Sequence, residues 1–344
     1  GLPICAEPGR VRVESGSRPG PAGGSTPIGQ TAPMPHPRRL RFAVELHEPL
    51  PGRTWLDSAR EVEQLGYSTV FLPDHFDEGP GPIAAAAAFA AVTRTLNVGI
   101  LVLDCDFRHP AVLARELATI DQIAEGRLEV GLGAGWKKAD YDRSGIPMDR
   151  PGVRVSRLQE HAAVLRGLWG DGPFSFSGDH YEITGLEGTP KPYRPGGPPI
   201  VVGGGAPRLL RWAGATADIV GVNASIHSGE IDEAAAHDAL ADRIDEKVGW
   251  VREGAGDRFD DLELNAWLAA AELTDDPAMV EGIAALFGTD ADSFRRSPLA
   301  LVGSPGDVAE MLAERRERWG YSYHVLPGDR AHDFAPLVAD LTGT

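Results

Sequence analysis

The feature that most constrains the fold is an alternation of eight short apolar runs with helical stretches, which begins at Leu40. The runs are rich in Val, Ile and Leu and do not alternate strictly with polar residues, which is typical of parallel strands covered on both faces. Eight strand–helix units close a (β/α)8 barrel, the TIM barrel, at the usual size, so we predict this α/β fold. The predicted strands are Arg41–Leu46, Thr69–Leu72, Asn97–Leu103, Leu128–Leu132, Ile200–Val202, Ile219–Val222, Leu262–Ala270 and Tyr321–Leu326.

The segments between these strands carry signals of helix formation. Thr54 directly precedes the first of them, and the run Ser304-Pro-Gly-Asp307 opens the last long one. The Ala-rich stretch Pro82–Val92 is shorter than the roughly 20 residues of a membrane span, so we predict a helix that faces the core. The other predicted helices are Thr54–Leu65, Ala111–Ala124, Val155–Trp169, Pro207–Ala215, Ile231–Arg252, Pro277–Phe287 and Asp307–Trp319.

Two kinds of segment depart from this rhythm. Residues 1–39 contain 7 Gly and 8 Pro and lack a periodic apolar pattern, so we predict a flexible arm there and assign residues 40–344 to the barrel domain. Residues 170–198, with an apparent hairpin, and residues 288–303 interrupt the barrel as insertions. Insertions after barrel strands build substrate sites, so we expect both of them to line the site.

The charge balance and the cysteine content exclude several classes of function. The chain carries a net charge of −17, which argues against nucleic acid or an anionic membrane as the main partner. Cys5 and Cys105 alone cannot form a disulfide framework or a thiolate zinc site, and we predict no metal. The first residues lack the pattern of a secretory signal. We therefore expect a cytoplasmic enzyme that acts on a small organic molecule.

Polar residues at the strand ends matter most, because the loops after the strands form the active face of such a barrel. Asp74 and His75 end the second strand, and a histidine beside a carboxylate can transfer a proton near neutral pH. The alternative is a helix-capping aspartate beside a surface histidine.

Other polar side chains near the strand ends leave their roles open. Asp104 and Asp106 follow the third strand and either face the site or cap the next helix. His47 and Glu48 follow the first strand and could likewise face the site. His324 within the eighth strand is expected to be packed in the core.

Two glycine-rich segments follow the fourth and fifth strands. In Gly131-Leu-Gly-Ala-Gly135 the glycines would let a planar or phosphorylated ligand approach the backbone, although tight packing at the barrel rim is the alternative. Gly203, Gly204, Gly205 and Ala206 lead into a predicted helix, whose free N–H groups would favour an anion. Asn223, at the end of the sixth strand, could add a polar contact. Motifs of serine hydrolases, zinc proteases and P-loop enzymes do not occur.

Taken together, these segments resemble the luciferase-like monooxygenase superfamily, and within it the branch that uses the deazaflavin coenzyme F420. The stretch from Leu101 to Trp136 is similar to the family's third strand, helix and fourth strand almost without gaps, and Pro199–Asn223 resembles its fifth and sixth strand unit. In the deazaflavin branch an Asp-His pair ends the second strand, as Asp74 and His75 do here.

The resemblance implies an F420-dependent oxidoreductase that transfers a hydride between C5 of the deazaflavin and an organic substrate, preferably as a reductase. His75 would donate or accept the proton, and Asp74 would orient it or bind the cofactor. A non-proline cis peptide bond would fall near Leu101–Val102. The residues expected to bind the cofactor are Leu101, Val102, Asp104, Gly133, Ala134, Gly135, Gly203, Gly204, Gly205, Ala206 and Asn223.

The sequence departs from the family's sugar-phosphate dehydrogenases at one informative position. These enzymes carry a catalytic glutamate where this chain has Trp136, and no convincing match for their phosphate-binding lysines is found, so that activity is not assigned. The acidic cofactor also contrasts with the net −20 of residues 40–344. A local basic groove could compensate, with contributions from Lys137, Lys138, Lys191, Arg194, Arg208 and Arg211.

Two other functions fit the same resemblance. The first is a monooxygenase that uses reduced FMN supplied by a separate reductase, and the second is a non-catalytic flavin-binding barrel. The Asp74-His75 pair and the complete eight-strand pattern argue against the second. Because members of this family are often dimers, the resemblance also implies a homodimer.

Overall fold

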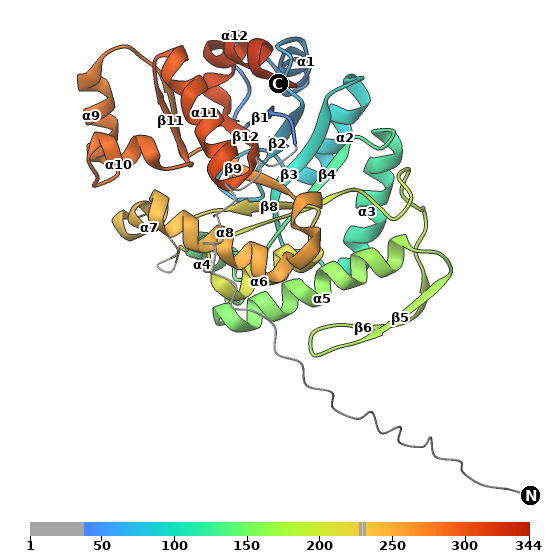
Figure 1. Cartoon of the computed structure of the whole chain (residues 1–344). Helices are drawn as coiled ribbons and strands as arrows, with labels where there is room; N and C mark the ends of the chain where they lie inside the picture. The colour runs from blue at the N-terminus through green and yellow to red at the C-terminus, as the bar shows by residue number, and fades with distance from the viewer. Residues whose placement is uncertain (1–37, 227–228, 230–231) are drawn as a thin grey trace, which may run out of the picture. The chain divides into compact units, whose positions relative to one another are not determined.

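Eight parallel strands form a closed barrel, with the helices arranged around it (Figure 1). The computed structural model describes residues 38–226, 229 and 232–344, so nearly all of the predicted arm lies outside the described residues. Around the barrel the strands follow the order β1-β12-β9-β8-β7-β4-β3-β2, which confirms the predicted TIM barrel. Their bounds are β1 (Arg41–Glu45), β2 (Thr69–Leu72), β3 (Asn97–Asp104), β4 (Leu128–Gly133), β7 (Ile200–Gly204), β8 (Ile219–Val222), β9 (Glu263–Trp267) and β12 (Tyr321–Pro327).

The helices begin where the sequence offers caps. Thr54 accepts a hydrogen bond from the Asp57 amide at the start of α1, and Ser304 and Asp307 form a reciprocal capping box at the start of α11. No described helix is long and apolar enough to cross a membrane. The helices that follow barrel strands are α1 (Trp55–Gln64), α2 (Pro82–Val92), α3 (Pro110–Ile123), α4 (Lys138–Ser144), α5 (Pro151–Trp169), α6 (Pro207–Thr216), α7 (Glu233–Asp238), α8 (Ala241–Ala255), α11 (Pro305–Trp319) and α12 (Ala331–Leu341).

The predicted single helix Ile231–Arg252 is wrong, because the chain forms two helices, α7 and α8, with a break at Ala239–Leu240. Asp238 at the end of α7 accepts hydrogen bonds from the Lys247 ammonium, at 2.5 Å, and from the Ser225 amide, at 2.8 Å. These contacts hold the end of α7 against the loop that follows β8. The apolar periodicity, which continues through the break, contains no sign of them.

The segment after β9 is larger than predicted. The expected strand Leu262–Ala270 is wrong at its end, because the chain changes pairing partner: the Leu268 amide bonds to Val325 of β12, whereas the Ala269 amide bonds to Leu299. A separate parallel pair follows, β10 (Ala270–Leu273) and β11 (Ala300–Gly303), with α9 (Pro277–Leu286) and α10 (Ala291–Arg296) between them. This insertion, residues 268–303, has a small apolar cluster of its own, formed by Val280, Ala284, Phe294, Ala300 and Val302.

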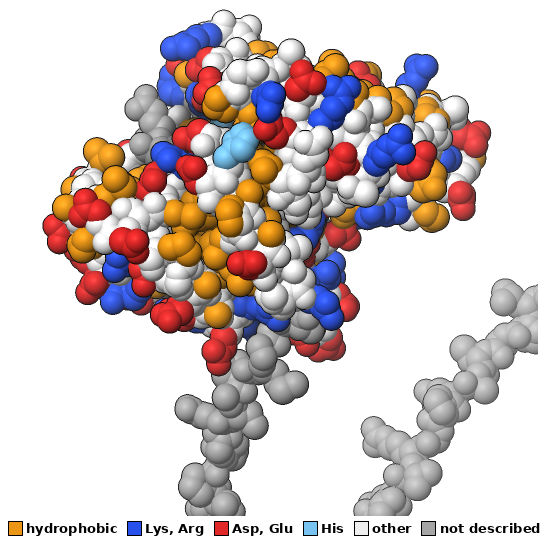
Figure 2. Space-filling view, turned by 90° about the horizontal axis from the view of Figure 1, so that it is seen from above, with side chains coloured by type: hydrophobic (Ala, Val, Ile, Leu, Met, Phe, Trp, Pro, Cys, Tyr) orange, Lys and Arg blue, Asp and Glu red, His pale blue; other side chains and the backbone are white. Residues whose placement is uncertain are grey.

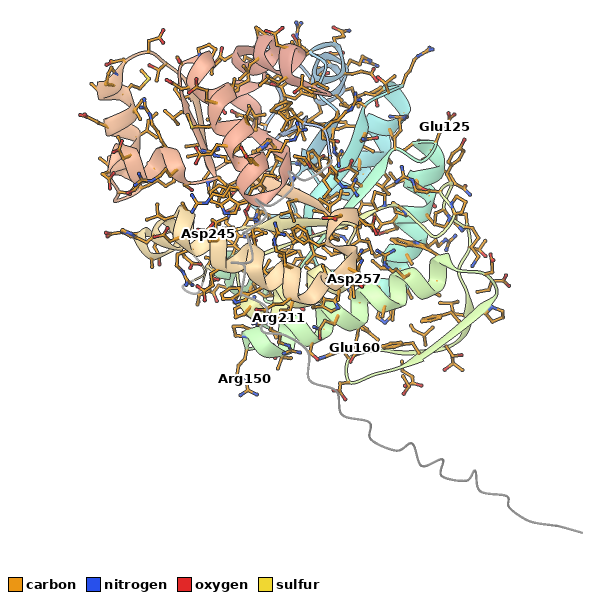
Figure 3. The ribbon with its side chains drawn as sticks, viewed as in Figure 1. Glu125, Arg150, Glu160, Arg211, Asp245 and Asp257 are labelled. Atoms are coloured by element: carbon orange, nitrogen blue, oxygen red, sulfur yellow. The ribbon has the colours of Figure 1, made fainter. Side chains whose placement is uncertain are left out.

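The other insertion forms the predicted hairpin, β5 (Pro173–Ser177) with β6 (Glu182–Glu187). Glu160 of α5, labelled in Figure 3, accepts hydrogen bonds from the Asp179 and His180 amides and so fixes the turn of this hairpin. Because the insertion follows a helix and precedes a strand, it leaves the barrel at the amino-terminal ends of the strands.

The amino-terminal end of the barrel is closed by a buried charged network. The Arg41 guanidinium binds Glu263 at 2.6 and 2.8 Å and Glu129 at 2.6 Å, and it lies 3.4 Å from the centre of the Tyr323 ring. The Tyr323 hydroxyl donates to Glu129 at 3.0 Å. Above this network the barrel interior is packed with apolar side chains that include Phe71, Val201 and Val325. In the described part of the chain the barrel interior is therefore filled from its amino-terminal end, and space for a ligand lies at the carboxyl-terminal end.

Replacement of Arg41 should destabilise the barrel, because it leaves the buried Glu129 and Glu263 without their cation. We expect Arg41→Met to lower the free energy of unfolding by about 3 kcal/mol, measured by urea denaturation. Arg60→Ala, which removes the exposed pair with Asp57, is the control and should cost less than about 1 kcal/mol. Equal losses of unfolding free energy in the two variants would show that the Arg41 network stabilises the barrel no more than an exposed ion pair does.

Candidate functional site

A cavity of about 710 Å³ opens at the carboxyl-terminal ends of the strands. This volume lies within the range of small-molecule and cofactor sites. Every residue predicted to be catalytic or to bind the cofactor lines this one cavity: Asp74, His75, Leu101, Val102, Asp104, Gly133, Ala134, Gly135, Gly203, Gly204, Gly205, Ala206 and Asn223.

The predicted contributions of the two insertions differ. Residues of the predicted 288–303 insertion line the cavity as expected, among them Thr289, Phe294 and Leu299. The expectation that the 170–198 insertion also lines it is wrong, because none of its residues reaches the cavity. That segment follows α5 rather than a barrel strand, so it lies at the other end of the barrel. The start of α5 takes its place in the wall, with Arg154 and Val155.

His75 is held by a carboxylate that the sequence analysis missed. Its Nδ1 lies 2.6 Å from Oδ2 of Asp140, and the other oxygen of Asp140 accepts the Phe76 amide at 3.2 Å. Asp140 lies in the first turn of the short helix α4 and is only 3% exposed. Because Nδ1 is engaged by the carboxylate, Nε2 is the nitrogen left to exchange a proton with a ligand. The Trp136 ring packs edge-on against the imidazole at 5.4 Å between ring centres.

Asp74 has other partners than its neighbour in sequence. Arg108 binds both of its oxygens, at 2.6 and 2.9 Å, and the Asp104 amide donates to it at 3.1 Å. The Asp74 carboxylate therefore fixes the loop after β3, while the orientation of His75 depends on Asp140. Neither Arg108 nor Asp140 was singled out from the sequence. The only signal for Asp140 is an acidic residue in the first turn of the helix after β4.

Asp104 lies at the cavity wall in a tightly packed arrangement. Its oxygens accept hydrogen bonds from the Tyr141 hydroxyl at 2.7 Å and from the Asp106 amide at 2.9 Å. Burial raises the pKa of Asp104 to about 6. Gly135 has a φ of +73°, and a Cβ there would lie 1.8 Å from the Tyr141 hydroxyl, so only glycine permits this approach.

Of the two candidates after β1, His47 lines the cavity whereas Glu48 is exposed and does not. The His47 imidazole lies between two carboxylates, 3.0 Å from Glu45 and 2.7 Å from Glu78. The hydrogen bond to Glu45, with the contact to Glu78, raises the pKa of His47 to about 9 despite partial burial. His47 is therefore a cation at neutral pH and not a proton shuttle. Of the remaining candidates, Asp106 pairs with Arg157, and His324 is buried as expected.

The backbone at the ends of β3, β4 and β7 forms a cradle for a flat ligand. The peptide bond between Leu101 and Val102 is cis, at the position that the resemblance implies. A Cβ on Gly133 would lie 2.4 Å from Cγ2 of Val102, and a Cβ on Gly205 would lie 2.5 Å from the Asn223 carbonyl. Side chains at these glycines would clash with their neighbours, so the cavity wall here consists of backbone.

Unpaired amide groups lie in the cavity beside the glycine cradle. Asn265 of β9 is 1% exposed, and neither atom of its amide has a hydrogen-bond partner; the Asn223 Oδ1 is also unpaired. Lys247, fully buried, donates to the Asn223 carbonyl at 2.8 Å and so fixes this residue. Buried amide atoms without partners are costly, and a ligand with donors and acceptors along one edge would satisfy them.

The loop Gly203–Ala206 meets the first turn of α6, where Ala206 caps the helix without a side-chain hydrogen bond. Its N–H groups are suited to an anion. The predicted basic groove is only partly present: Lys137 and Lys138 line the cavity, together with Arg150 and Arg154.

The other predicted basic residues are engaged elsewhere. Lys191 donates to the Leu168 carbonyl, Arg194 to the Gly126 carbonyl and Arg208 to the Gly152 carbonyl, and none of the three lines the cavity. Arg211 pairs with Glu253 on the outside of the barrel. On the face seen in Figure 2, acidic and basic side chains are interspersed, and hydrophobic ones gather in one area.

One group of side chains in the described part of the chain has donor atoms spaced closely enough for a metal ion, namely Asp104, Cys105 and Asp106. Tyr141 and Arg157 already bind the two carboxylates. Burial raises the pKa of the Cys105 thiol well above its usual value, which disfavours the thiolate that a metal requires. These three residues are therefore better suited to packing than to metal binding.

Comparison with known proteins agrees with the geometry. The family model of luciferase-like monooxygenases matches residues 39–251, well over half of the chain. The chain belongs to the luciferase-like monooxygenase family.

Members of this family that resemble the chain differ in their cofactor. An F420-dependent glucose-6-phosphate dehydrogenase of Amycolatopsis mediterranei is 30% identical over 174 residues, which cover 48% of this chain and 52% of that protein. An FMNH2-dependent dimethylsulfone monooxygenase of Pseudomonas putida is 29% identical over 65% of this chain and 63% of that protein. The chain thus spans about half the length of the first of these curated relatives and somewhat more of the second.

Solved structures of the luciferase-like monooxygenase fold cover nearly all of the barrel. The F420-dependent tetrahydromethanopterin reductase of Methanopyrus kandleri superimposes with a TM-score of 0.69 at 20% identity, over 89% of this chain and 99% of that one. At this identity the likeness establishes the fold.

The raised pKa of His47 predicts a pH dependence of stability. A group whose pKa is raised on folding stabilises the protein fully below its unfolded value of about 6.5, and this contribution is lost as the pH rises to about 9. The wild type should therefore lose more unfolding free energy between pH 6 and pH 9 than His47→Gln, measured by urea denaturation. Identical pH profiles would contradict the assigned pKa.

Proposed function

We propose that the protein is an F420-dependent oxidoreductase that transfers a hydride between C5 of the deazaflavin and a small organic substrate, with reduction of the substrate as the preferred direction. The observation that carries the proposal is His75, fixed by Asp140 in the wall of a cavity that also contains a backbone cradle and unpaired amides. The resemblance of about half of the chain to F420-dependent dehydrogenases supports it. When bound, F420 supplies two-electron hydride chemistry, so the protein has to supply position and a proton.

The residues present fit a phosphorylated, flat cofactor. Gly133 and Gly205 let Val102 and the chain at Asn223 pack closely at the strand ends, so a flat ring would lie against main chain in this part of the cavity. Asn223 and Asn265 offer amide atoms to the polar edge of such a ring. The N–H groups of Gly203–Ala206, before α6, would hold its phosphate.

The proton is assigned to Nε2 of His75. The hydrogen bond between Nδ1 and Asp140 selects the tautomer and fixes the plane of the ring, so Nε2 faces a ligand in a defined direction. The Trp136 ring, perpendicular to the imidazole, packs against His75 and helps to hold it in this orientation. Asp74, bound to Arg108, keeps the loop after β3 in place at the cofactor side.

Replacement of His75 should separate the chemical step from cofactor binding. We expect His75→Ala to reduce turnover by about 10²–10⁴-fold and to leave the dissociation constant of F420 nearly unchanged, because the imidazole acts on the substrate. Asp140→Asn should also lower turnover and should change the pH dependence of turnover, because Asp140 binds Nδ1 of His75. His332→Ala, on the exposed side of α12, is the control. The assay is reoxidation of reduced F420 by an aryl methyl ketone, and unchanged single-turnover transfer in His75→Ala would remove His75 from the mechanism.

The second candidate is a monooxygenase that uses reduced FMN, because one relative of comparable similarity depends on FMNH2. Titration of the protein with F420 and with FMN, followed by quenching of the cofactor's fluorescence, separates the two. We expect F420 to bind at least about tenfold more tightly, a difference of about 1.4 kcal/mol. Tighter binding of FMN would favour the monooxygenase, and binding without any turnover would favour the non-catalytic flavin-binding barrel.

A further inference from the structure

We propose that the wall of the cavity built by β9, the 268–303 insertion and the α7–α8 turn binds an uncharged, largely apolar carbonyl compound and rejects phosphorylated or carboxylated substrates. We call this wall the apolar wall. The inference rests on the proposed function, because it names the substrate class for the same cavity.

The apolar wall carries no ionisable side chain. It is built from three aromatic rings, small alanines and a few neutral polar groups, and all of these lie within the described part of the chain. Its members are Ala235, Ala236, Ala239, Leu240, Asn265, Trp267, Ala269, Phe287, Thr289, Phe294, Ser297, Leu299 and Ala300. A surface of this composition stabilises a ligand by apolar burial, and it would leave a charged group of the ligand desolvated and unpaired.

The cations elsewhere in the cavity are engaged by the protein itself. Lys137 pairs with Asp77 at 2.6 Å and also contacts Glu78, and Lys138 pairs with Asp142. The Arg154 guanidinium donates to the backbone carbonyls of the loop after β4.

Arg150, at the amino-terminal end of α5, is exposed, and its side chain extends away from the ribbon in Figure 3. Arg154 is buried and forms no ion pair, and its Nε has no hydrogen-bond partner among the described residues, so the rejection of anions is a property of the apolar wall and not of the α5 side of the cavity.

A buried carboxylate borders the apolar wall and adds a repulsive element. Glu45 at the end of β1 is 3% exposed and accepts the Trp267 indole N–H at 2.5 Å. His47 binds Glu45 and Glu78, and Lys137 binds Glu78 and Asp77, so the charges on this side of the cavity are paired, and Glu45 is the carboxylate that contacts Trp267. An anionic substrate placed against Trp267 would lie beside Glu45, which costs free energy at low dielectric.

The apolar wall is held in place by hydrogen bonds to the rest of the chain. The Ser297 hydroxyl donates to the Ala239 carbonyl at 2.7 Å, which joins the insertion to the α7–α8 turn. Arg315 of α11, 2% exposed, donates to the carbonyls of Arg295 at 2.9 Å and Ala300 at 2.6 Å. The wall is thus already formed in the protein and does not depend on ligand binding to assemble it.

The proposal is tested with matched pairs of ligands. Methyl ketones that bear a cyclohexyl, phenyl or naphthyl group are titrated by calorimetry, each with and without a carboxylate on the far side of the ring. Both the free protein and the protein saturated with oxidised F420 are used. We expect at least one neutral ketone to bind at least about tenfold more tightly than its carboxylate. Equal or tighter binding of the carboxylates, or no binding of any neutral ketone, would overturn the proposal.

A single added charge provides the second arm. Thr289→Arg introduces a cation into the apolar wall and should reverse the preference toward the carboxylated member of each pair. Thr119→Arg, at an exposed position on α3, is the matched control and should leave the preference unchanged. Unchanged selectivity in Thr289→Arg would show that the ligands do not bind at this wall.

The outcome can be separated from that of the proposed function, because cofactor choice is measured independently. Tight F420 binding together with a preference for carboxylated ketones would refute the substrate class and leave the oxidoreductase intact. A preference for neutral ketones together with tighter binding of FMN would refute the F420-dependent function and leave the substrate class intact.

Discussion

The site depends on the short helix α4, which joins the ends of two neighbouring barrel strands. Asp140 binds His75 after β2, and the adjacent Tyr141 binds Asp104 after β3. These two contacts set the position of the imidazole relative to the backbone cradle, and Gly135 permits them because no Cβ would fit beside the Tyr141 hydroxyl. The glycines at the end of β4 therefore have two tasks: Gly133 lets Val102 pack against β4, and Gly135 lets α4 approach the strands.

Closure of the barrel explains why these contacts occur at only one end. Arg41, with its two carboxylate partners and the Tyr323 ring, fills the barrel at the amino-terminal ends of the strands. Parallel strands bring all eight carboxyl ends to the opposite side, so residues as distant in the chain as Glu45 and Trp267 meet there. The parallel topology thus brings residues from separate strand ends together around one cavity.

Much of this could be predicted from the sequence, because strand ends and glycine runs are local signals. The eight barrel strands, Asp74, His75 and the two glycine segments at the cavity were found in this way, whereas Leu101 and Val102 were expected from the family resemblance. Asp140 was missed because its contact with His75 spans 65 residues and follows no periodic pattern. The 170–198 hairpin was wrongly expected to line the cavity. It follows a helix and not a strand, so it lies at the other end of the barrel, and apolar periodicity alone does not indicate this. The break before α8 depends on Lys247, whose ammonium reaches Asp238 nine residues earlier and the Asn223 carbonyl 24 residues earlier, at no helical spacing.

The small apolar cluster of the 268–303 insertion is separate from the barrel core. None of the five residues of this cluster belongs to a barrel strand, but Phe294 and Ala300 also line the cavity. A substitution that repacks the cluster at Phe294 would therefore change the shape of the surface that a ligand meets, while the hydrogen bonds between the eight barrel strands stay in place.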